Sequence, residues 1–323
     1  MCPAPGPALR PRRAPDHAPH PRVRRSGVRA RPDLLDGALT PPAPAPFDFR
    51  RSEPGGELGR HVESLWYARG TVPYERERIA PTGSTVAVVV LGDPIRQTPD
   101  DGAGPVVTSA TGLLIGPHDR PVVNEPTGET FAVGIVTTPV GCRSVFGAAP
   151  AELRSRVVEL TDVWAPASRL RSALAAIDDP DTMLRCVETV LGDELAAAPP
   201  GLERCEAALT LIATDPTAPI GDIATEVGVS REHLAREFTR IVGLTPRVLA
   251  RLLRMRRLLA AIDVHGAVGW QALAADLGWF DQAHLIRDFR RHTGVTPTAY
   301  LAAQRAGLTA VETADAAGFV PEL

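Results

Sequence analysis

Residues 227–238 read VGVSREHLAREF, and residues 277–289 read LGWFDQAHLIRDF. The first stretch is followed by GLTP at 243–246 and the second by GVTP at 294–297, so the two tetrapeptides lie 51 residues apart. The second copy has one extra residue in its turn, between its glycine and its central arginine. A repeat of this length with helical spacing of its apolar residues predicts two copies of one small helical unit.

Each copy has the pattern of a helix-turn-helix unit. Gly228 and Gly278 can adopt the positive φ that a tight turn needs, and Ser230 and Asp281 are expected to cap the helix that follows. A further helix is expected after each copy, because Thr245-Pro246 and Thr296-Pro297 have the form of an N-cap followed by proline. The second helix of each copy places its apolar residues on one face, Leu234, Phe238 and Ile241 in the first copy, Leu285 and Phe289 in the second.

The remaining faces of this region are strongly basic. From Gly228 to Leu258 the sequence contains eight arginines and two acidic residues, a balance that suits a phosphate backbone. The helix that begins at Pro246 is expected to continue to about Asp263, which corresponds to about 27 Å. With its flanking packing, such a helix could hold two recognition helices about 34 Å apart, which is one turn of DNA.

Residues 205–305 resemble the two-unit helix-turn-helix domain of the AraC/XylS family of bacterial transcription regulators. The most specific part of the resemblance is the second copy, with its DQAH at 281–284, FRR at 289–291 and GVTP at 294–297, ending at Tyr300. The resemblance implies a DNA-binding transcription factor whose partner is double-stranded DNA and which needs no metal or other cofactor. It also implies that the outward residues of each second helix contact bases, namely Arg231, Glu232, Ala235 and Arg236 in the first copy, and Gln282, Ala283, Ile286 and Arg287 in the second.

Three of these positions depart from the polar residues that many relatives carry. The side chains of Ala235, Ala283 and Ile286 have no hydrogen-bonding groups, so they are expected at most to touch thymine methyl groups. Specificity is therefore expected to come chiefly from Arg236, Gln282 and Arg287. Other basic residues on the outward faces are expected to contact DNA too, mainly its phosphates: Arg240, Arg247, Arg251, Arg254 and Arg290.

The part of the chain before the repeat is expected to be a regulatory domain. Runs rich in Val, Ile and Thr at 84–91, 106–115 and 130–137, bounded by Gly and Pro, predict a β-rich barrel or sandwich, cupin-like in kind. After Pro150 the apolar period becomes helical. The stretches at 79–83, 115–117 and 146–164 resemble the β-rich N-terminal domain fused to some AraC-type regulators, which implies ligand sensing or dimerisation. The fold class expected for the chain is α+β.

Four segments follow from these patterns. Residues 1–46, rich in Pro and Arg, are expected to be a disordered tail, 47–198 the β-rich domain ending in helices, 199–306 the double helix-turn-helix domain, and 307–323 a flexible C-terminal tail. No apolar run approaches the roughly 18 residues of a membrane span, so a cytoplasmic protein without a membrane partner is expected. A small-molecule effector, a second copy of the chain and RNA polymerase are possible partners, and the sequence leaves open whether the chain dimerises.

Two other function classes remain open at this stage. The first is an enzyme fused to the DNA-binding region, a thiol-based methyl acceptor for which Cys142 is the candidate nucleophile. The second is a protein-binding module built on the same helices. The scattered cysteines predict no zinc site, and we expect His233 and His284 to pack locally and not to bind metal. The expectation is therefore a protein that is not an enzyme and has no catalytic and no metal-binding residue.

Overall fold

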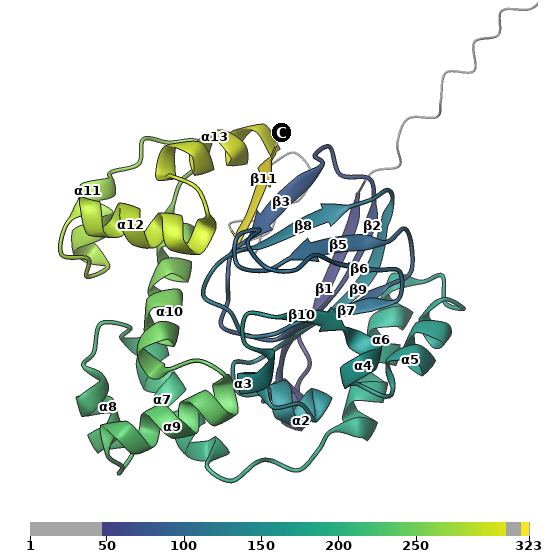
Figure 1. Cartoon of the computed structure of the whole chain (residues 1–323), viewed down its shortest axis with the longest axis horizontal. Helices are drawn as coiled ribbons and strands as arrows, with labels where there is room; N and C mark the ends of the chain where they lie inside the picture. Colours follow the sequence, from purple (N-terminus) through teal and green to yellow (C-terminus); the bar gives the residue numbers. More distant parts are fainter. Residues whose placement is uncertain (1–46, 308–317, 323) are drawn as a thin grey trace, which may run out of the picture. The chain divides into compact units, whose positions relative to one another are not determined.

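A computed structural model describes residues 47–307 and 318–322, and all of these belong to one compact unit that runs from Pro44 to Leu323. The predicted N-terminal tail, residues 1–46, lies outside the described residues. Two antiparallel sheets are formed mainly by the N-terminal part of the described chain, and the helices that follow in sequence lie beside them (Figure 1). The expected α+β class, with a β-rich N-terminal region followed by helices, is confirmed.

The larger sheet, sheet A, has six strands in the order β1-β2-β9-β4-β7-β10, and the smaller one, sheet B, has five in the order β11-β3-β8-β5-β6. All neighbours in both sheets pair antiparallel, and the bounds of the strands of sheet A are Asp48–Ser52 (β1), Val62–Gly70 (β2), Thr130–Thr137 (β9), Val86–Val90 (β4), Gly112–Ile115 (β7) and Val157–Glu159 (β10). Those of sheet B are Phe319–Glu322 (β11), Arg76–Ile79 (β3), Val122–Pro126 (β8), Ile95–Thr98 (β5) and Val107–Ser109 (β6).

Both faces of sheet A are buried. Along β4, Val88 and Val90 point into a core shared with β5 and β8 of sheet B, whereas Ala87 and Val89 point into a second core lined by helices. Alternation of side chains along a strand produces these two faces, and burial of both explains why β4 reads VAVVV without a polar residue. The result is three layers: sheet B, sheet A, and a layer of helices.

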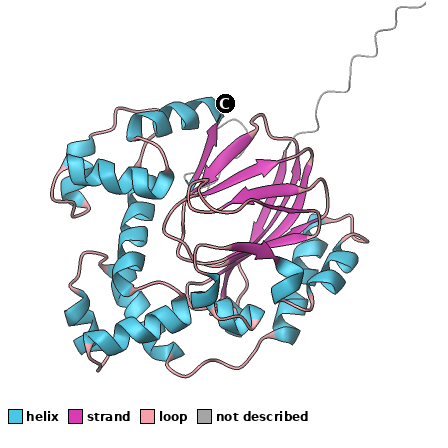
Figure 2. Ribbon diagram, viewed as in Figure 1, coloured by secondary structure: helices cyan, strands magenta, loops and turns pink. Residues whose placement is uncertain are grey.

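The helical layer comes from the segment that follows the strands (Figure 2). Trp164, Leu170 and Leu191 are buried in the core against sheet A. The helices of the β-rich region are Gly56–Gly59 (α1), Cys142–Phe146 (α2), Pro150–Leu153 (α3), Leu160–Val163 (α4), Ala167–Leu174 (α5) and Pro180–Glu194 (α6). The sequence predicted this change to helices but missed β10, because three residues are too few to show a period.

Seven further helices form the C-terminal part of the described residues. They are Leu202–Thr214 (α7), Ile220–Glu226 (α8), Arg231–Val242 (α9), Pro246–Ala261 (α10), Trp270–Asp276 (α11), Gln282–Thr293 (α12) and Pro297–Gly307 (α13). The predicted caps are confirmed: the Thr245 hydroxyl accepts from the Val248 N–H at 3.3 Å, and α13 begins at Pro297.

The C-terminal end of the chain differs from expectation. We expected residues 307–323 to form a flexible tail, but Phe319–Glu322 is strand β11, paired antiparallel with β3 at the edge of sheet B. Val320 is buried, and Glu322 forms ion pairs with Arg76 and Arg78 of β3. The sequence did not predict this strand because its stability comes from a sheet edge that lies about 240 residues earlier in the chain. The four segment boundaries proposed from the sequence otherwise remain predictions.

Candidate nucleic-acid interface

Two helix-turn-helix units lie in the C-terminal part, α8 with α9 and α11 with α12. Gly228 and Gly278 close the two turns with φ of 74° and 79°, a conformation that glycine adopts without strain. The Ser230 hydroxyl accepts from the N–H of His233 at 3.2 Å, and the Asp281 carboxylate from that of His284 at 2.6 Å. The predicted turns and caps are therefore confirmed in both units.

Each unit has its own core. Phe238 is completely buried among residues of α7, α8 and α9, and Phe289 is completely buried among residues of α10 to α13, in edge-to-face contact with Trp270 and Tyr300. Helix α10 contributes to both cores, Leu249 and Leu252 to the first and Met255 and Leu258 to the second. One continuous helix thus ties the two units together.

Most of the residues predicted to contact DNA lie at the surface of the two recognition helices, α9 and α12, or of α10. The exposed ones are Arg231, Glu232, Arg236 and Arg240 on α9, Arg247 on α10, and Gln282, Ala283, Arg287 and Arg290 on α12. Hydrogen bonds from its own backbone N–H and from the Ser230 hydroxyl keep the pKa of Glu232 below its usual value, so this carboxylate is ionised at neutral pH. Contact of these side chains with DNA stays a prediction.

Four predicted residues are less available than the sequence suggested. Ala235 and Arg251 are half-buried, and Ile286 is half-buried against the core of the second unit. Arg254 was expected to face DNA phosphates, and the structure corrects this: its side chain is 13% exposed and bonds to the Gly278 carbonyl at 3.0 Å and to Asp288 at 3.1 Å. Its guanidinium also lies 4.3 Å from the centre of the Trp279 ring.

Comparison with known families agrees with this geometry. Residues 223–303 match a family described as a helix-turn-helix domain, and residues 50–159 match a domain of unknown function, DUF6597. The first match runs from α8 into α13, so a single family covers both units. Residues 223–303 form an AraC-type helix-turn-helix domain. The chain therefore contains a DNA-binding module of the kind found in transcription regulators.

Comparison with solved structures also found matches. ToxT from Vibrio cholerae is 13% identical over 82% of this chain and 99% of that chain, with a TM-score of 0.44, and another ToxT structure contains an unsaturated fatty acid. A regulator with an AraC-type DNA-binding domain from Chromobacterium violaceum is 28% identical over 32% of this chain and 93% of its own, with a TM-score of 0.28. The activator CuxR is 14% identical over 69% of this chain and 89% of its own, with a TM-score of 0.22. No curated protein matched the chain.

A charged cluster of the same kind involves each of the two units. In the first unit Arg204 of α7 donates to both carboxylate oxygens of Glu237 at 2.9 Å. In the second unit Arg254 of α10 pairs with Asp288, which also accepts from the Trp279 indole N–H at 2.9 Å. We call these two clusters the arginine clamps. Each one holds a recognition helix to the helix that precedes its unit.

The histidines of the repeat belong to the same clamps. His233 Nε2 lies 3.6 Å from Glu237, and His284 Nε2 lies 3.5 Å from Asp288, which agrees with the local packing role expected for both. The acidic partners Glu237 and Asp288 were not among the residues predicted from the sequence. The repeat contained the signal, because Glu237 and Asp288 are 51 residues apart, as the two histidines are.

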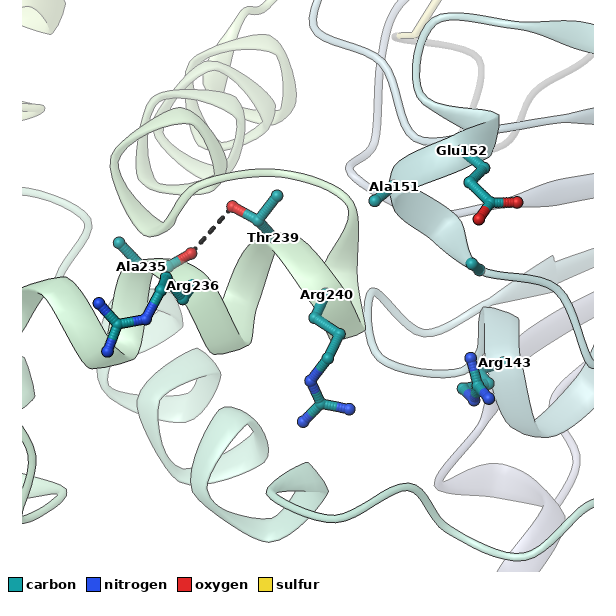
Figure 3. Close-up of a pocket in the computed structure, with 8 residues that line it drawn as sticks. Arg143, Ala151, Glu152, Ala235, Arg236, Thr239 and Arg240 are labelled. Carbon is teal, nitrogen blue, oxygen red and sulfur yellow. Dashed lines mark hydrogen bonds between the residues drawn. The ribbon is translucent and has the colours of Figure 1, made fainter.

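The two recognition helices differ in what covers them. Ala235, Arg236, Thr239 and Arg240 of α9 line an open cleft of about 580 Å³, whose other wall is formed by Arg143 of α2, Ala149, and Ala151 and Glu152 of α3 (Figure 3). Ala151 points toward α9, whereas Glu152 points away from it (Figure 3). The C-terminal end of α9 comes still closer, because a Cβ added to Gly243 would lie 2.8 Å from the Pro150 carbonyl oxygen.

Ion pairs join the same two regions. Arg60, beside β2, pairs with Glu206 of α7 at 2.9 Å, and Glu63 of β2 pairs with Arg256 of α10 at 3.1 Å. Arg240, which was predicted to contact DNA, donates to the carbonyl oxygen of Pro200 at 2.5 Å. The ion pairs thus hold α7 and α10, the neighbours of the recognition helix, to the β-rich region, and α3 packs against α9 itself.

Helix α12 is bonded to the β-rich region near its C-terminal end. Arg291 pairs with Asp119 at 2.6 Å, and the ring Nδ1 of His292 donates to the Asp119 carbonyl at 3.0 Å. Burial lowers the pKa of His292 to about 4, so the ring is neutral at physiological pH. The N-terminal end of α12, which carries Gln282 and Ala283, remains exposed.

Cys142 does not have the surroundings of a nucleophile. It is 1% exposed in the core against sheet A, and burial raises the pKa of its thiol to about 11. A reactive cysteine needs the opposite, a lowered pKa and access to substrate. Within residues 47–307 and 318–322, no group of three or more His, Cys, Asp or Glu side chains could hold a metal ion, and no helix has the length and apolar character of a membrane span.

Proposed function

We propose that this protein is a sequence-specific transcription regulator whose two helix-turn-helix units read adjacent major grooves of double-stranded DNA. The observation that carries the proposal is the duplicated unit, with an exposed basic or polar N-terminal end on each recognition helix. Recognition helices of this motif enter the major groove by their N-terminal residues. The 16 residues of α10 give it a length of about 24 Å, and the flanking packing would extend the separation toward one DNA turn.

The roles of the individual side chains follow from their chemistry. Arg236 and Arg287 would donate two hydrogen bonds to guanine, and Gln282 would pair with adenine. The apolar side chains Ala235, Ala283 and Ile286 would contact thymine methyl groups. Arg231 would donate to a base edge, and Glu232 would accept from a cytosine amino group. Phosphate contacts would come from the remaining exposed arginines, with Arg251 at their edge: Arg240, Arg247 and Arg290.

The β-rich region would regulate the first unit. A recognition helix in the major groove lies in a channel about 12 Å wide, which leaves no room for a second element along its side. Helix α3 lies beside the C-terminal half of α9, so it would limit how far the first unit enters the groove until the β-rich region moves away. A small-molecule effector or a second copy of the chain that favours the separated arrangement would then increase affinity.

The test is selection of DNA from a random pool by the full chain, followed by a salt titration on the selected site. Two sequence blocks about one DNA turn apart are expected, with an affinity that falls as salt rises because arginines release counterions. If no sequence is enriched, the proposal of specific binding fails. If DNA binding shows no salt dependence, the helices are better explained as a protein-binding module.

The regulatory part is tested by the double variant Arg60→Glu/Glu63→Arg. It places like charges opposite Glu206 and Arg256, keeps the net charge, and leaves the AraC-type domain unchanged. The block read by the first unit should become stronger in this variant while the block read by the second unit stays the same. Identical blocks for variant and wild type would show that α3 does not restrain the first unit.

A further inference from the structure

The side chain of Phe280 is 92% exposed, the most exposed large hydrophobic side chain in the described part of the chain. It lies in the turn between α11 and α12, directly before the N-cap residue Asp281. Its neighbour Trp279 is buried and bonds to Asp288. The turn thus places one aromatic side chain in the core of the second unit and the next one in solvent.

Packing within the domain does not explain this position. A hydrophobic residue before an N-cap commonly packs on the fourth helical residue, which here is Leu285. Leu285 is completely buried in the core of the second unit, and the exposure of Phe280 shows that this contact is absent. The first unit has no counterpart, because its turn reads Gly228-Val229-Ser230 and is one residue shorter.

The surroundings of Phe280 indicate what it contacts. It lies at the N-terminal end of recognition helix α12, next to the exposed residues Gln282 and Ala283. This end of the helix is the one that faces the base edges when the motif is bound to DNA. The apolar group that the major groove offers to an aromatic side chain is the C5-methyl group of thymine. Contact with it would remove the apolar surface of both partners from water.

We propose that Phe280 reads a thymine methyl group in the DNA block recognised by the second unit. The proposal rests on the proposed function, since it needs α12 to lie in the major groove. Aligning the two units residue by residue does not reveal this specificity residue, because the shorter turn of the first unit has no residue that corresponds to Phe280. The proposal also assigns the second unit an apolar contact that does not depend on the half-buried Ile286.

The experiment uses the full chain and the site that it selects. Every thymine of the site is replaced in turn by uracil, which removes only the methyl group, and the dissociation constants of wild type, Phe280→Ala and Phe280→Leu are measured. At one position of the second block, uracil should weaken wild type about fourfold, the value expected for one buried methyl group. Phe280→Ala should show no loss at that position, and Phe280→Leu should retain part of it.

Val106→Ala is the matched control, because Val106 is an exposed apolar residue, 59% exposed, in the β-rich region. This variant should show the same uracil profile as wild type. If wild type selects a site but Phe280→Ala keeps the wild-type profile, the contact proposed here is refuted and DNA reading by the two units stands. If Phe280→Ala loses affinity equally for all sequences, base reading by Phe280 is also refuted. Failure of wild type to select any site would refute the proposed function itself, and the assignment of Phe280 with it.

Discussion

The first and second helix-turn-helix units each have a turn closed by glycine, a side-chain cap and an arginine clamp, but they differ in what lies beside the recognition helix. Helix α9 has α3 of the β-rich region along its C-terminal half, whereas the bonds of α12 to that region come from Arg291 and His292 at the end of the helix. A duplicated unit can thus be restrained in one copy and left accessible in the other. The copies are therefore expected to contribute unequally to DNA binding in the arrangement described here.

The clamps offer the largest expected difference between the units. Arg254→Ala should destabilise the protein by about 3–5 kcal/mol, because Asp288 would remain as an uncompensated charge that is only 12% exposed. Arg204→Ala should cost about 1 kcal/mol: Glu237 is 13% exposed, but the Arg204 side chain is 36% exposed, so water screens the pair and reaches Glu237 once the guanidinium is gone. Urea unfolding measures both values. The double variant Arg254→Ala/Asp288→Asn should regain more than half of the loss, and equal losses at Arg204 and Arg254 would contradict the comparison.

The restraint on α9 predicts an asymmetry in DNA binding. Arg287→Ala should weaken binding to the selected site by about 1–3 kcal/mol and relax one base of the second block. Arg236→Ala should have little effect in the wild-type background and a loss of the same size in Arg60→Glu/Glu63→Arg. Fluorescence anisotropy with labelled duplexes measures each case. Equal losses for the two single variants in the wild-type background would show that α9 is already free to read DNA.

Mild acid should affect the second unit through His292, whose place in the first unit is taken by Ile241. Burial holds the pKa of His292 near 4 in the folded protein, below the value of about 6.5 when unfolded, so the unfolded state binds the extra proton first. The stability from this neutral ring is complete above pH 6.5 and is lost as the pH falls toward 4. At pH 5.5 the loss should be about 1.4 kcal/mol.

The variant His292→Asn isolates this effect, since asparagine can still donate to the Asp119 carbonyl but does not titrate. His61 and His118 have pKa values lowered by burial too, and they remain in both proteins. The difference in unfolding free energy between wild type and variant should therefore shrink by about 1.4 kcal/mol between pH 7.5 and 5.5. A constant difference across this range would show that His292 is not the group responsible.

The caps should give the smallest difference. Ser230→Ala and Asp281→Ala are each expected to cost about 1 kcal/mol of unfolding free energy. The Asp281 variant should lose a few tenths of a kcal/mol more, because its carboxylate is charged at the positive end of α12 and its hydrogen bond is shorter. Thermal unfolding compares the two, with Thr245→Ala as a cap outside the recognition helices. A larger loss at Ser230 would reverse the order.

Local features of the AraC-type domain were predictable from the sequence. Gly228, Ser230 and the apolar stripe through Phe238 act within one turn of helix or one short turn, so neighbouring residues determine their structure. Because the unit is repeated, each of these local predictions also applied to the second copy. In the β-rich region the strands were predicted as a class, but the run at 106–115 proved to be two strands, β6 and β7, in different sheets.

Contacts between distant segments were not predictable in this way. The expectation that Arg254 faces phosphate came from helical spacing alone, whereas its true partner, Asp288, lies 34 residues later. The packing of α3 against α9 depends on how the β-rich region docks on the helix-turn-helix units. The spacing of apolar residues within α3 or α9 does not indicate this docking. The DNA contacts themselves remain a prediction, because their partner is a second molecule.

Strand β11 has a consequence for the order in which the chain is made. It follows the whole AraC-type domain in sequence, yet it pairs with β3, which is synthesised before that domain. Sheet B can therefore be completed only after both helix-turn-helix units have been translated, and its last strand is added across about 240 residues of intervening chain. Until then β3 has a free edge, so a nascent chain that stalls inside the AraC-type domain exposes a strand to which another chain can pair.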